Sequence, residues 1–258
     1  MILEALELPE HLQCHIKLSK KAFVEHAKHK NAVQRLLQEQ VASLHIVAHL
    51  TPDNSNIAAY KNAQYEYLEL MVLQCELKEK DIRNSQLNAL HRLFHQHIPY
   101  PLVVEISAPH REQVQWSLAH KTINQSDAES ALLVLSDIHT THWFSTAKFD
   151  ILTRELKEKL KLSQQNHSHL FALYDSLVQH FIAFLLASNL KKTTLGEPNA
   201  AYSAERSQDE ILKKVLQLKQ NIAALEAKRD KTTQFNEKVA LNVKVQALKN
   251  ALQAIDLK

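Results

Sequence analysis

Glycine is nearly absent from this sequence: the chain of 258 residues contains only Gly196. Phosphate-binding loops need glycine where backbone amides approach a ligand closely, so the chain has neither a P-loop nor a dinucleotide-binding fingerprint. It also lacks the Gly-x-Ser-x-Gly turn of the α/β-hydrolases. These absences exclude P-loop NTPases and Rossmann dehydrogenases.

Cysteines and long apolar runs are also scarce. The two cysteines, Cys14 and Cys75, suit a reducing cytosol and provide no disulfide framework. No apolar run approaches the roughly 20 residues that are needed to span a bilayer. The N-terminal segment MILEALELPEH carries acidic residues and lacks the basic region of a signal peptide. We therefore expect a cytoplasmic protein without a membrane partner.

The positive charge of the chain is concentrated near its C-terminus. The formal net charge is only +3, but residues 209–258 hold 10 Lys and Arg against 6 Asp and Glu, which leaves 21 against 22 elsewhere. An acidic partner is therefore expected at the C-terminal segment and not at the rest of the chain. A mildly basic helical surface is also common in proteins that have no such partner.

Hydrophobic periodicity in the first part of the chain predicts strands alternating with helices. The Pro-containing segment IPYP at 98–101 ends a helix and leads into a strand, which predicts a right-handed β–α–β crossover. The expected fold class is mixed α/β (α+β mixed), with a mixed five-stranded sheet flanked by helices. The expected strands are 41–50, 66–78, 102–107, 113–121 and 131–139, and the expected helices are 19–40 (one or two, capped by Ser19), 82–97, 146–162 and 168–189.

A different pattern occupies the C-terminal part. Residues 191–207 contain the only glycine, a proline and small polar residues, which is typical of a linker. Beyond them, apolar residues step by four and three on two segments separated by AKRDKTTQ, which predicts an antiparallel helical hairpin of the coiled-coil type. We thus expect a globular domain at 1–190, a linker at 191–207 and a hairpin at 208–258. The two heptad seams consist of Ile211, Val215, Leu218, Ile222 and Leu225, and of Leu241, Val245, Leu248, Leu252 and Ile255.

Several short motifs occur in an order that spans nearly the whole chain. They are Pro52, Asp53 and Asn56, ELK at 76–78, IPYP at 98–101, HTTHW at 139–143 and QFNEKVALN at 234–242. Together they resemble a bacterial domain-of-unknown-function family, the DUF4391 type, that is met beside helicases and DNA methyltransferases in phage-defence and restriction loci. The family has no assigned activity that the resemblance could carry over to this chain. The resemblance implies an accessory component of a defence system that modifies or translocates DNA.

Three residues suggest a nuclease as the alternative function. In a PD-(D/E)xK nuclease, Mg²⁺ lies between an acidic residue and the Glu of Glu-x-Lys, and the lysine lies near the attacking water. Asp53, Glu76 and Lys78 have suitable types and spacing. The structural alternative is equally simple: Glu76 and Lys78 share a strand face through the two-residue period, and Asp53 caps a turn.

The 16 histidines raise the question of a metal site. His91 and His95 lie four residues apart on a predicted helix, which is a spacing that zinc sites use, but no Glu or Cys completes a motif. His139 and His142 are the better candidate pair, because they lie where a predicted strand ends. The alternative for all of them is solvent exposure or packing.

The motif QFNEKVALN on the second C-terminal helix is the candidate partner-binding surface. Phe235 is its expected aromatic anchor, with Asn236, Lys238, Val239 and Asn242 around it. The alternative is that the asparagines fix the register of the hairpin, as buried asparagines do in coiled coils.

Basic residues crowd the expected tip of the hairpin. Lys228, Arg229 and Lys231 are the candidate contacts to nucleic acid or to an acidic protein surface. Charges at a loop are also commonly only solvated.

The sequence favours a non-enzymatic interaction subunit that docks on a helicase or DNA methyltransferase and contacts protein or DNA through its hairpin. No cofactor is expected, or Mg²⁺ if the chain is a nuclease. A hairpin that pairs with a second copy, giving a homo-oligomer, is a third hypothesis.

Overall fold

The computed structural model describes residues 1–25, 30–79, 81–123, 133–195 and 208–256. The chain divides into two compact units, Met1–Phe181 and Ile182–Lys258. This division falls inside a helix and not at residue 190, and most of the predicted linker lies outside the described residues. The predicted domain limits therefore stay predictions.

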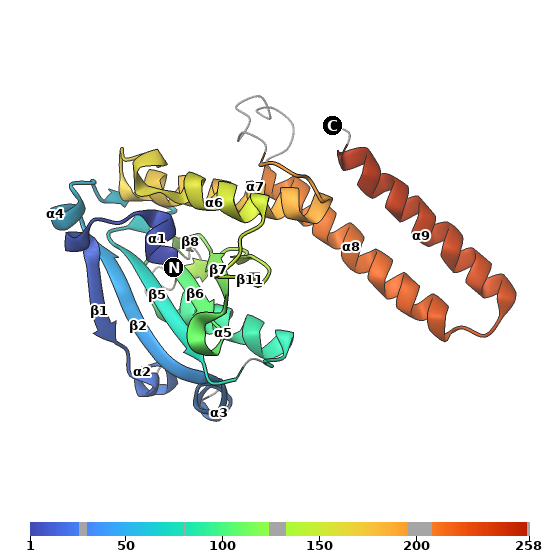
Figure 1. The fold of residues 1–258 in the computed structure, drawn as a ribbon, viewed down its shortest axis with the longest axis horizontal. Helices are drawn as coiled ribbons and strands as arrows, with labels where there is room; N and C mark the ends of the chain where they lie inside the picture. The colour runs from blue at the N-terminus through green and yellow to red at the C-terminus, as the bar shows by residue number, and fades with distance from the viewer. Residues whose placement is uncertain (26–29, 80, 124–132, 196–207, 257–258) are drawn as a thin grey trace. The chain divides into compact units, whose positions relative to one another are not determined.

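The first unit is built around a mixed sheet (Figure 1). Its strand order is β1-β2-β5-β6-β7-β10, and β11 also pairs with β7. Among the described strands of this sheet, only β5 and β6 run parallel, and the other neighbours are antiparallel. These strands are β1 Gln13–Lys17, β2 Val41–Leu50, β5 Leu70–Leu77, β6 Leu102–Ser107, β7 Gln113–Leu118, β10 His139–Thr140 and β11 Phe144–Ser145.

Two small hairpin sheets accompany the main sheet within the described residues. One pairs β3 Tyr60–Lys61 with β4 Glu66–Tyr67, and the other pairs β8 Lys121–Ile123 with β9 Leu133–Leu135. The helices of this unit, with the 3₁₀ turns marked η, are α1 Ile2–Leu6, η1 Glu10–Leu12, α2 Lys20–Glu25, α3 Lys30–Gln40, α4 Pro52–Ser55, α5 Asn84–His97, η2 Pro109–Arg111, α6 Ile151–Leu160, η3 Leu162–Gln164 and α7 Leu170–Leu190, which continues into the second unit.

The predicted fold class is confirmed, and the sheet is larger than predicted. Strands β2, β5, β6 and β7 match four of the five expected strands. The prediction for 131–139 is wrong in its pairing, because β9 pairs with β8 outside the main sheet. The sequence pattern missed β1, whose side chains are mostly exposed and so show no hydrophobic alternation.

Successive side chains of β5 point to opposite faces of the sheet, and apolar ones are buried on both faces. Helices therefore cover each face. On one face, Leu73 and Cys75 pack with Phe23 of α2, Leu37 of α3 and Phe94 of α5. The opposite face contributes Val72 to a leucine-rich contact with α1, α6, η3 and α7. The result is a three-layer α/β/α arrangement.

Helix α7 has the length and composition to cross a membrane. This corrects the expectation that no apolar run approaches that length. However, 61% of its most apolar window is buried inside the structure. Tyr174 on this helix accepts a hydrogen bond from Ala119 N (3.0 Å) and donates one to Leu102 O (2.8 Å). The burial of α7 is that of a helix in a protein core.

The second unit contains the predicted helical hairpin, α8 Gln208–Lys231 and α9 Phe235–Asp256. Every apolar residue of the two predicted heptad seams is buried or half-buried. Ion pairs also join the helices: Lys228 lies 3.8 Å from Glu237, and Glu226 lies 2.8 Å from Lys249. The seam and these pairs confirm an antiparallel helix pair.

Candidate functional site

Asp53 lies at the surface on α4, directly after β2. This short helix begins with a capping box: Thr51 Oγ1 accepts from Asn54 N (3.3 Å), and Asn54 Oδ1 accepts from Thr51 N (2.8 Å). The local capping groups are therefore Thr51 and Asn54, and not Asp53 as the turn hypothesis supposed.

Glu76 lies at the other end of the β2–β5 pair. The antiparallel register places Glu76 opposite Ser43, whereas Leu70, at the start of β5, lies opposite Leu50. Asp53 follows Leu50, so at roughly 3.3 Å per residue the two carboxylates are separated by about 20 Å along the strands. The structure does not bring Asp53 and Glu76 together.

Across the strand pair, Glu76 lies opposite a residue with a hydroxyl and not a second carboxylate. Ser43 Oγ donates to Glu76 Oε2 over 3.5 Å. Lys78 turns away to the end of α3, where its Nζ donates to Gln38 O (2.5 Å) and its backbone N to Gln40 O (2.8 Å). Glu76 and Lys78 thus hold β5 to its neighbours.

Within the described part of the chain, His139 and His142 do not belong to a group of potential metal ligands. His139 lies on β10 opposite Leu118, and His142 follows that strand in the segment before β11. Among the residues that the structure describes, no group of three or more His, Cys, Asp or Glu side chains has the geometry to hold a metal ion.

His91 and His95 instead form a buried polar network with β7. Both histidines on α5 are 1% exposed, and Ser117 is completely buried. Ser117 Oγ lies 2.7 Å from His91 Nδ1 and 3.0 Å from His95 Nε2. His91 Nε2 lies 2.9 Å from Gln115 Oε1, and Gln115 Nε2 donates to Thr141 O over 2.7 Å.

The proton positions in this network can be assigned by starting from the backbone carbonyl of Thr141. Thr141 O can only accept, so the amide of Gln115 presents its oxygen to His91. His91 therefore donates from Nε2, and its Nδ1 accepts from the hydroxyl of Ser117. That hydroxyl has no second hydrogen, so His95 donates to it from Nε2. His95 Nδ1 is left as a buried acceptor without a hydrogen-bond partner among the described residues.

Burial sets the protonation of this network. It lowers the pKa of His91 to about 4 and the pKa of His95 well below its usual value, so both rings are neutral near pH 7. A serine hydroxyl that donates to histidine resembles a nucleophile with its base. No substrate reaches Ser117, however, because the residue is fully buried. The network is a packing feature.

Lys121 is a second buried ionisable group on the same side of the sheet. Its Nζ donates to Ile98 O and to Tyr100 O, the latter over 2.6 Å, so it holds the IPYP segment that ends α5. The side chain is 3% exposed, and burial lowers its pKa to about 7. Hydrophobic periodicity does not identify Lys121 as a buried residue.

A Tyr–His–Asp chain lies at the edge of the first unit. Burial raises the pKa of the Tyr67 phenol, so its hydroxyl stays protonated and donates to His120 Nδ1 over 2.6 Å. His120 Nε2 then donates to Asp175 over 3.1 Å. Rings of Tyr65 and Phe171 pack around His120. The chain thus links Tyr67 of β4 and His120, which lies between β7 and β8, to Asp175 of α7.

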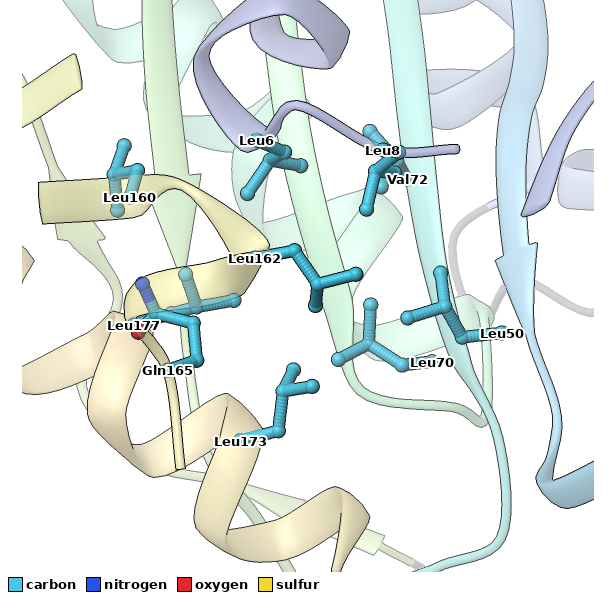
Figure 2. Close-up of a pocket in the computed structure, with 10 residues that line it drawn as sticks. All are labelled: Leu6, Leu8, Leu50, Leu70, Val72, Leu160, Leu162, Gln165, Leu173 and Leu177. Atoms are coloured by element: carbon cyan, nitrogen blue, oxygen red, sulfur yellow. The ribbon is translucent and has the colours of Figure 1, made fainter. Parts of the chain in front are cut away.

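A small pocket on the other face of the sheet is lined by aliphatic side chains (Figure 2). Its lining includes Leu6 of α1, Leu70 of β5 and Leu173 of α7, so it lies between the sheet and the helices on that face. Gln165 is its one polar lining residue, and its amide donates to Lys159 O (2.6 Å) and Lys161 O (2.9 Å). The pocket therefore offers a ligand no polar group for orientation.

The hairpin carries the predicted partner-binding residues. Phe235, Val239 and Val243 on α9 are 78%, 45% and 65% exposed. Asn236 and Lys238 are exposed beside them. The sequence analysis did not include Val243 among the partner-binding residues, although it follows Val239 by the same four-residue step that separates Val239 from Phe235.

Asn242 differs from its neighbours because it joins the two helices. Its Oδ1 accepts from Arg229 Nη1 over 3.1 Å. Asn242 is therefore engaged within the hairpin, although it is exposed and not buried as the register hypothesis supposed.

Acidic neighbours offset part of the positive charge at the tip of the hairpin. Lys228 pairs with Glu237 (3.8 Å), and Arg229 pairs with Asp230 (2.9 Å), while Lys231 is exposed. The three residues lie within the last turn of α8, so the structure brings them together at one end of the hairpin.

Comparison with known proteins gives a family and nothing narrower. Residues 6–252 match the sequence model of a family described as Domain of unknown function (DUF4391). No curated protein matches the chain. No solved structure matches it either.

Proposed function

Because the chain belongs to the DUF4391 family, and because its hairpin exposes apolar side chains, we propose that it is a non-enzymatic interaction subunit of a bacterial defence complex. The complex is of the anti-phage or restriction-modification type and acts in the cytoplasm. The partner is a helicase or DNA methyltransferase, the classes that the motif resemblance implies. The basic tip of the hairpin supplies an additional contact to DNA.

The exposed stripe of Phe235, Val239 and Val243 carries this proposal. Large apolar side chains on a soluble surface favour an interaction site when they lie next to one another. The three residues follow a four-residue step, so they lie on one side of α9. An aromatic residue within such a patch is a typical anchor of a protein interface.

The nuclease alternative has less support. A metal ion cannot bind Asp53 and Glu76 together across about 20 Å of strand. Ser43, the residue opposite Glu76, provides a hydroxyl where a second carboxylate would be needed.

Co-purification tests the proposal. The tagged full-length chain is co-expressed with the helicase and with the DNA methyltransferase of its own locus, and the retained partner is quantified. We expect one of them to be retained, and we expect Phe235→Asp with Val239→Asp to lower retention by about tenfold or more. The double variant should keep its circular dichroism spectrum, since both residues are exposed.

Two results would contradict the proposal. One is that neither protein is retained by the unmodified chain. The other is Mg²⁺-dependent DNA cleavage that is lost in Glu76→Ala, which would identify a nuclease.

A further inference from the structure

The nearly zero net charge of residues 1–208 conceals a basic segment. Residues 11–38 hold six Lys and Arg against one acidic residue, Glu25, which leaves 15 Lys and Arg against 21 Asp and Glu in the other residues before position 209. This segment includes β1, an edge strand of the main sheet, together with α2 and most of α3 (Figure 1). Positive charge that is separated from negative charge in this way favours an anionic partner.

Four lysines, named the lysine cluster here, come together at one end of the sheet: Lys17, Lys20, Lys21 and Lys78. Strands β1 and β5 both run antiparallel to β2, so their C-terminal ends lie at the same end of the sheet. Lys17 ends β1, Lys78 directly follows β5, and α2 begins with Lys20 and Lys21. Burial, together with the charges of Lys78 and Lys17, lowers the pKa of Lys20, as expected for cations that lie close together.

Two members of the cluster also support the fold. Lys20 Nζ donates to Val41 O, and Lys78 Nζ donates to Gln38 O over 2.5 Å, so both ammonium groups are held where α3 ends and β2 begins. The side chains of Lys17 and Lys21 are exposed, and they form neither a hydrogen bond nor an ion pair with any described residue. These two lysines are therefore available to a ligand.

Acidic side chains do not neutralise the lysine cluster. Glu39 pairs with Arg35 over 2.6 Å, and Glu76 accepts from Ser43 over 3.5 Å. Glu25 and Glu79 are exposed and adjoin the cluster in the sequence, and each offsets one charge at most. The four lysines thus leave a net positive surface at this end of the sheet.

The composition of this surface favours phosphates over a protein partner. Protein interfaces have a more apolar centre and are depleted in lysine. The exposed apolar neighbour of Lys17 is Ile16, which is 52% exposed, but side chains alternate along a strand, so Ile16 points to the opposite face of the sheet. Lysine ammonium groups are typical contacts to phosphate oxygens, where they position a nucleic acid without reading its bases.

The same composition favours a duplex over a single strand. Proteins that bind single strands stack the bases on aromatic side chains. Phe23 is the one Phe, Tyr or Trp between residues 11 and 50, and it is buried in the core. The surface therefore offers charge for a backbone and no such ring on which unpaired bases could stack.

We infer that the lysine cluster contacts the phosphate backbone of a DNA duplex independently of its base sequence. This contact differs from the one proposed for the tip of the hairpin, because the lysine cluster belongs to the first unit. The choice of DNA over RNA rests on the proposed function, whereas the phosphate contact itself does not.

Salt-dependent binding to DNA tests the inference. The full-length chain is titrated onto a fluorescent duplex of about 24 base pairs with random sequence, and anisotropy is measured from about 50 to 200 mM salt. Each phosphate contact contributes about 0.9 to the slope of the logarithm of affinity against the logarithm of salt concentration. We expect Lys17→Gln with Lys21→Gln to weaken binding by about tenfold or more and to make the slope shallower by about 2.

Two further double variants serve as controls. Lys148→Gln with Arg154→Gln removes two exposed positive charges elsewhere in the first unit, and it should change the affinity by less than about twofold because distant charges are screened. Lys228→Gln with Lys231→Gln measures the contact of the hairpin tip separately. Circular dichroism of each variant shows whether the fold is kept, which we expect because the altered side chains of Lys17 and Lys21 are exposed.

The outcomes separate this inference from the proposed function. The inference is overturned if the Lys17 and Lys21 variant behaves like the Lys148 and Arg154 control, or if only the hairpin variant loses affinity. Tighter binding of single-stranded DNA or of an RNA duplex also overturns it, as does equal competition by polyglutamate at the same charge concentration. Loss of duplex binding in the Lys17 and Lys21 variant, combined with a failure of co-purification, supports the lysine cluster and rejects the proposed defence partners.

Discussion

Helices α5 and α9 both depart from the usual pattern in which polar side chains are exposed and apolar side chains are buried, but they do so in opposite ways. Helix α5 buries two histidines, and α9 exposes Phe235 and two valines. Gln115 and Ser117 of the same unit engage three of the four ring nitrogens, and His95 Nδ1 is the one that lacks a partner among the described residues. The exposed side chains of α9 have no comparable cover among the described residues. Buried polar side chains that are hydrogen-bonded within their own unit are explained by the fold. Exposed apolar side chains that lie next to one another favour an interaction surface.

The two phenylalanines of these helices give the largest expected contrast. Phe94 is fully buried and Phe235 is 78% exposed. Phe94→Ala should lower the free energy of unfolding by about 3–5 kcal/mol, because it leaves a cavity. Phe235→Ala should change it by less than about 0.5 kcal/mol. Urea denaturation of both variants measures this, and a similar loss in both would show that Phe235 supports the fold.

Buried Lys121 should make the first unit more stable at alkaline pH. Its pKa falls from its usual value of 10.5 to about 7 on folding, so the unfolded chain binds more protons between these values and stability rises with pH. From pH 7 to pH 9 this residue alone contributes about 2 kcal/mol. Denaturant titrations at both pH values test this. The slope should flatten in Lys121→Met, and parallel slopes would contradict the assignment.

His91 should make the same unit less stable in acid. Its pKa is about 4 in the folded chain against 6.5 when unfolded, so stability is retained above pH 6.5 and is lost as the pH falls toward 4. Between pH 7 and pH 5 the loss is about 2 kcal/mol. The ring proton signals of His91, followed by NMR, should not titrate above pH 5. Titration near 6.5 would show that the ring is solvated.

The hairpin ion pair between Glu226 and Lys249 should have the smallest effect. Both side chains are partly exposed, so Lys249→Ala should cost about 0.5 kcal/mol or less. Val245→Ala, in the buried seam of the same helix, should cost more, because it removes apolar contacts. Thermal unfolding of both variants gives the comparison. Equal losses would mean that charge and not the seam holds the hairpin.

Hydrophobic periodicity predicted the helices of the hairpin and the apolar face of α5. In each case the apolar residues repeat at helical spacing within one helix, so the pattern can be read from the sequence. The seam from Ile211 to Leu225 and the leucines at 87, 90 and 93 are buried or half-buried as expected. The strand β1 gave no such signal, since it lies at the edge of the sheet and exposes most of its side chains.

The geometry of the candidate sites could not be predicted, because it depends on contacts between residues that are far apart in the sequence. Asp53 and Glu76 have a suitable spacing along the chain, but the antiparallel register of β2 and β5 places them at opposite ends. His91 and His95 could not be assigned to the interior because their partners on β7 lie more than 20 residues away.

The carboxylate of Glu105 has a consequence for how the chain folds during its synthesis. It is 1% exposed and accepts hydrogen bonds from the indole of Trp116 (2.9 Å), the amide of Gln74 (2.9 Å) and the backbone N of Ile2 (2.8 Å). Ile2 precedes this acceptor by 103 residues. At a translation rate of about 5–20 residues per second, the first helix has to wait roughly 5–20 s for its anchor. Helix α1 therefore lacks this anchor until β6 has been synthesised, and a chaperone that shields α1 in this interval would raise the yield of folded protein.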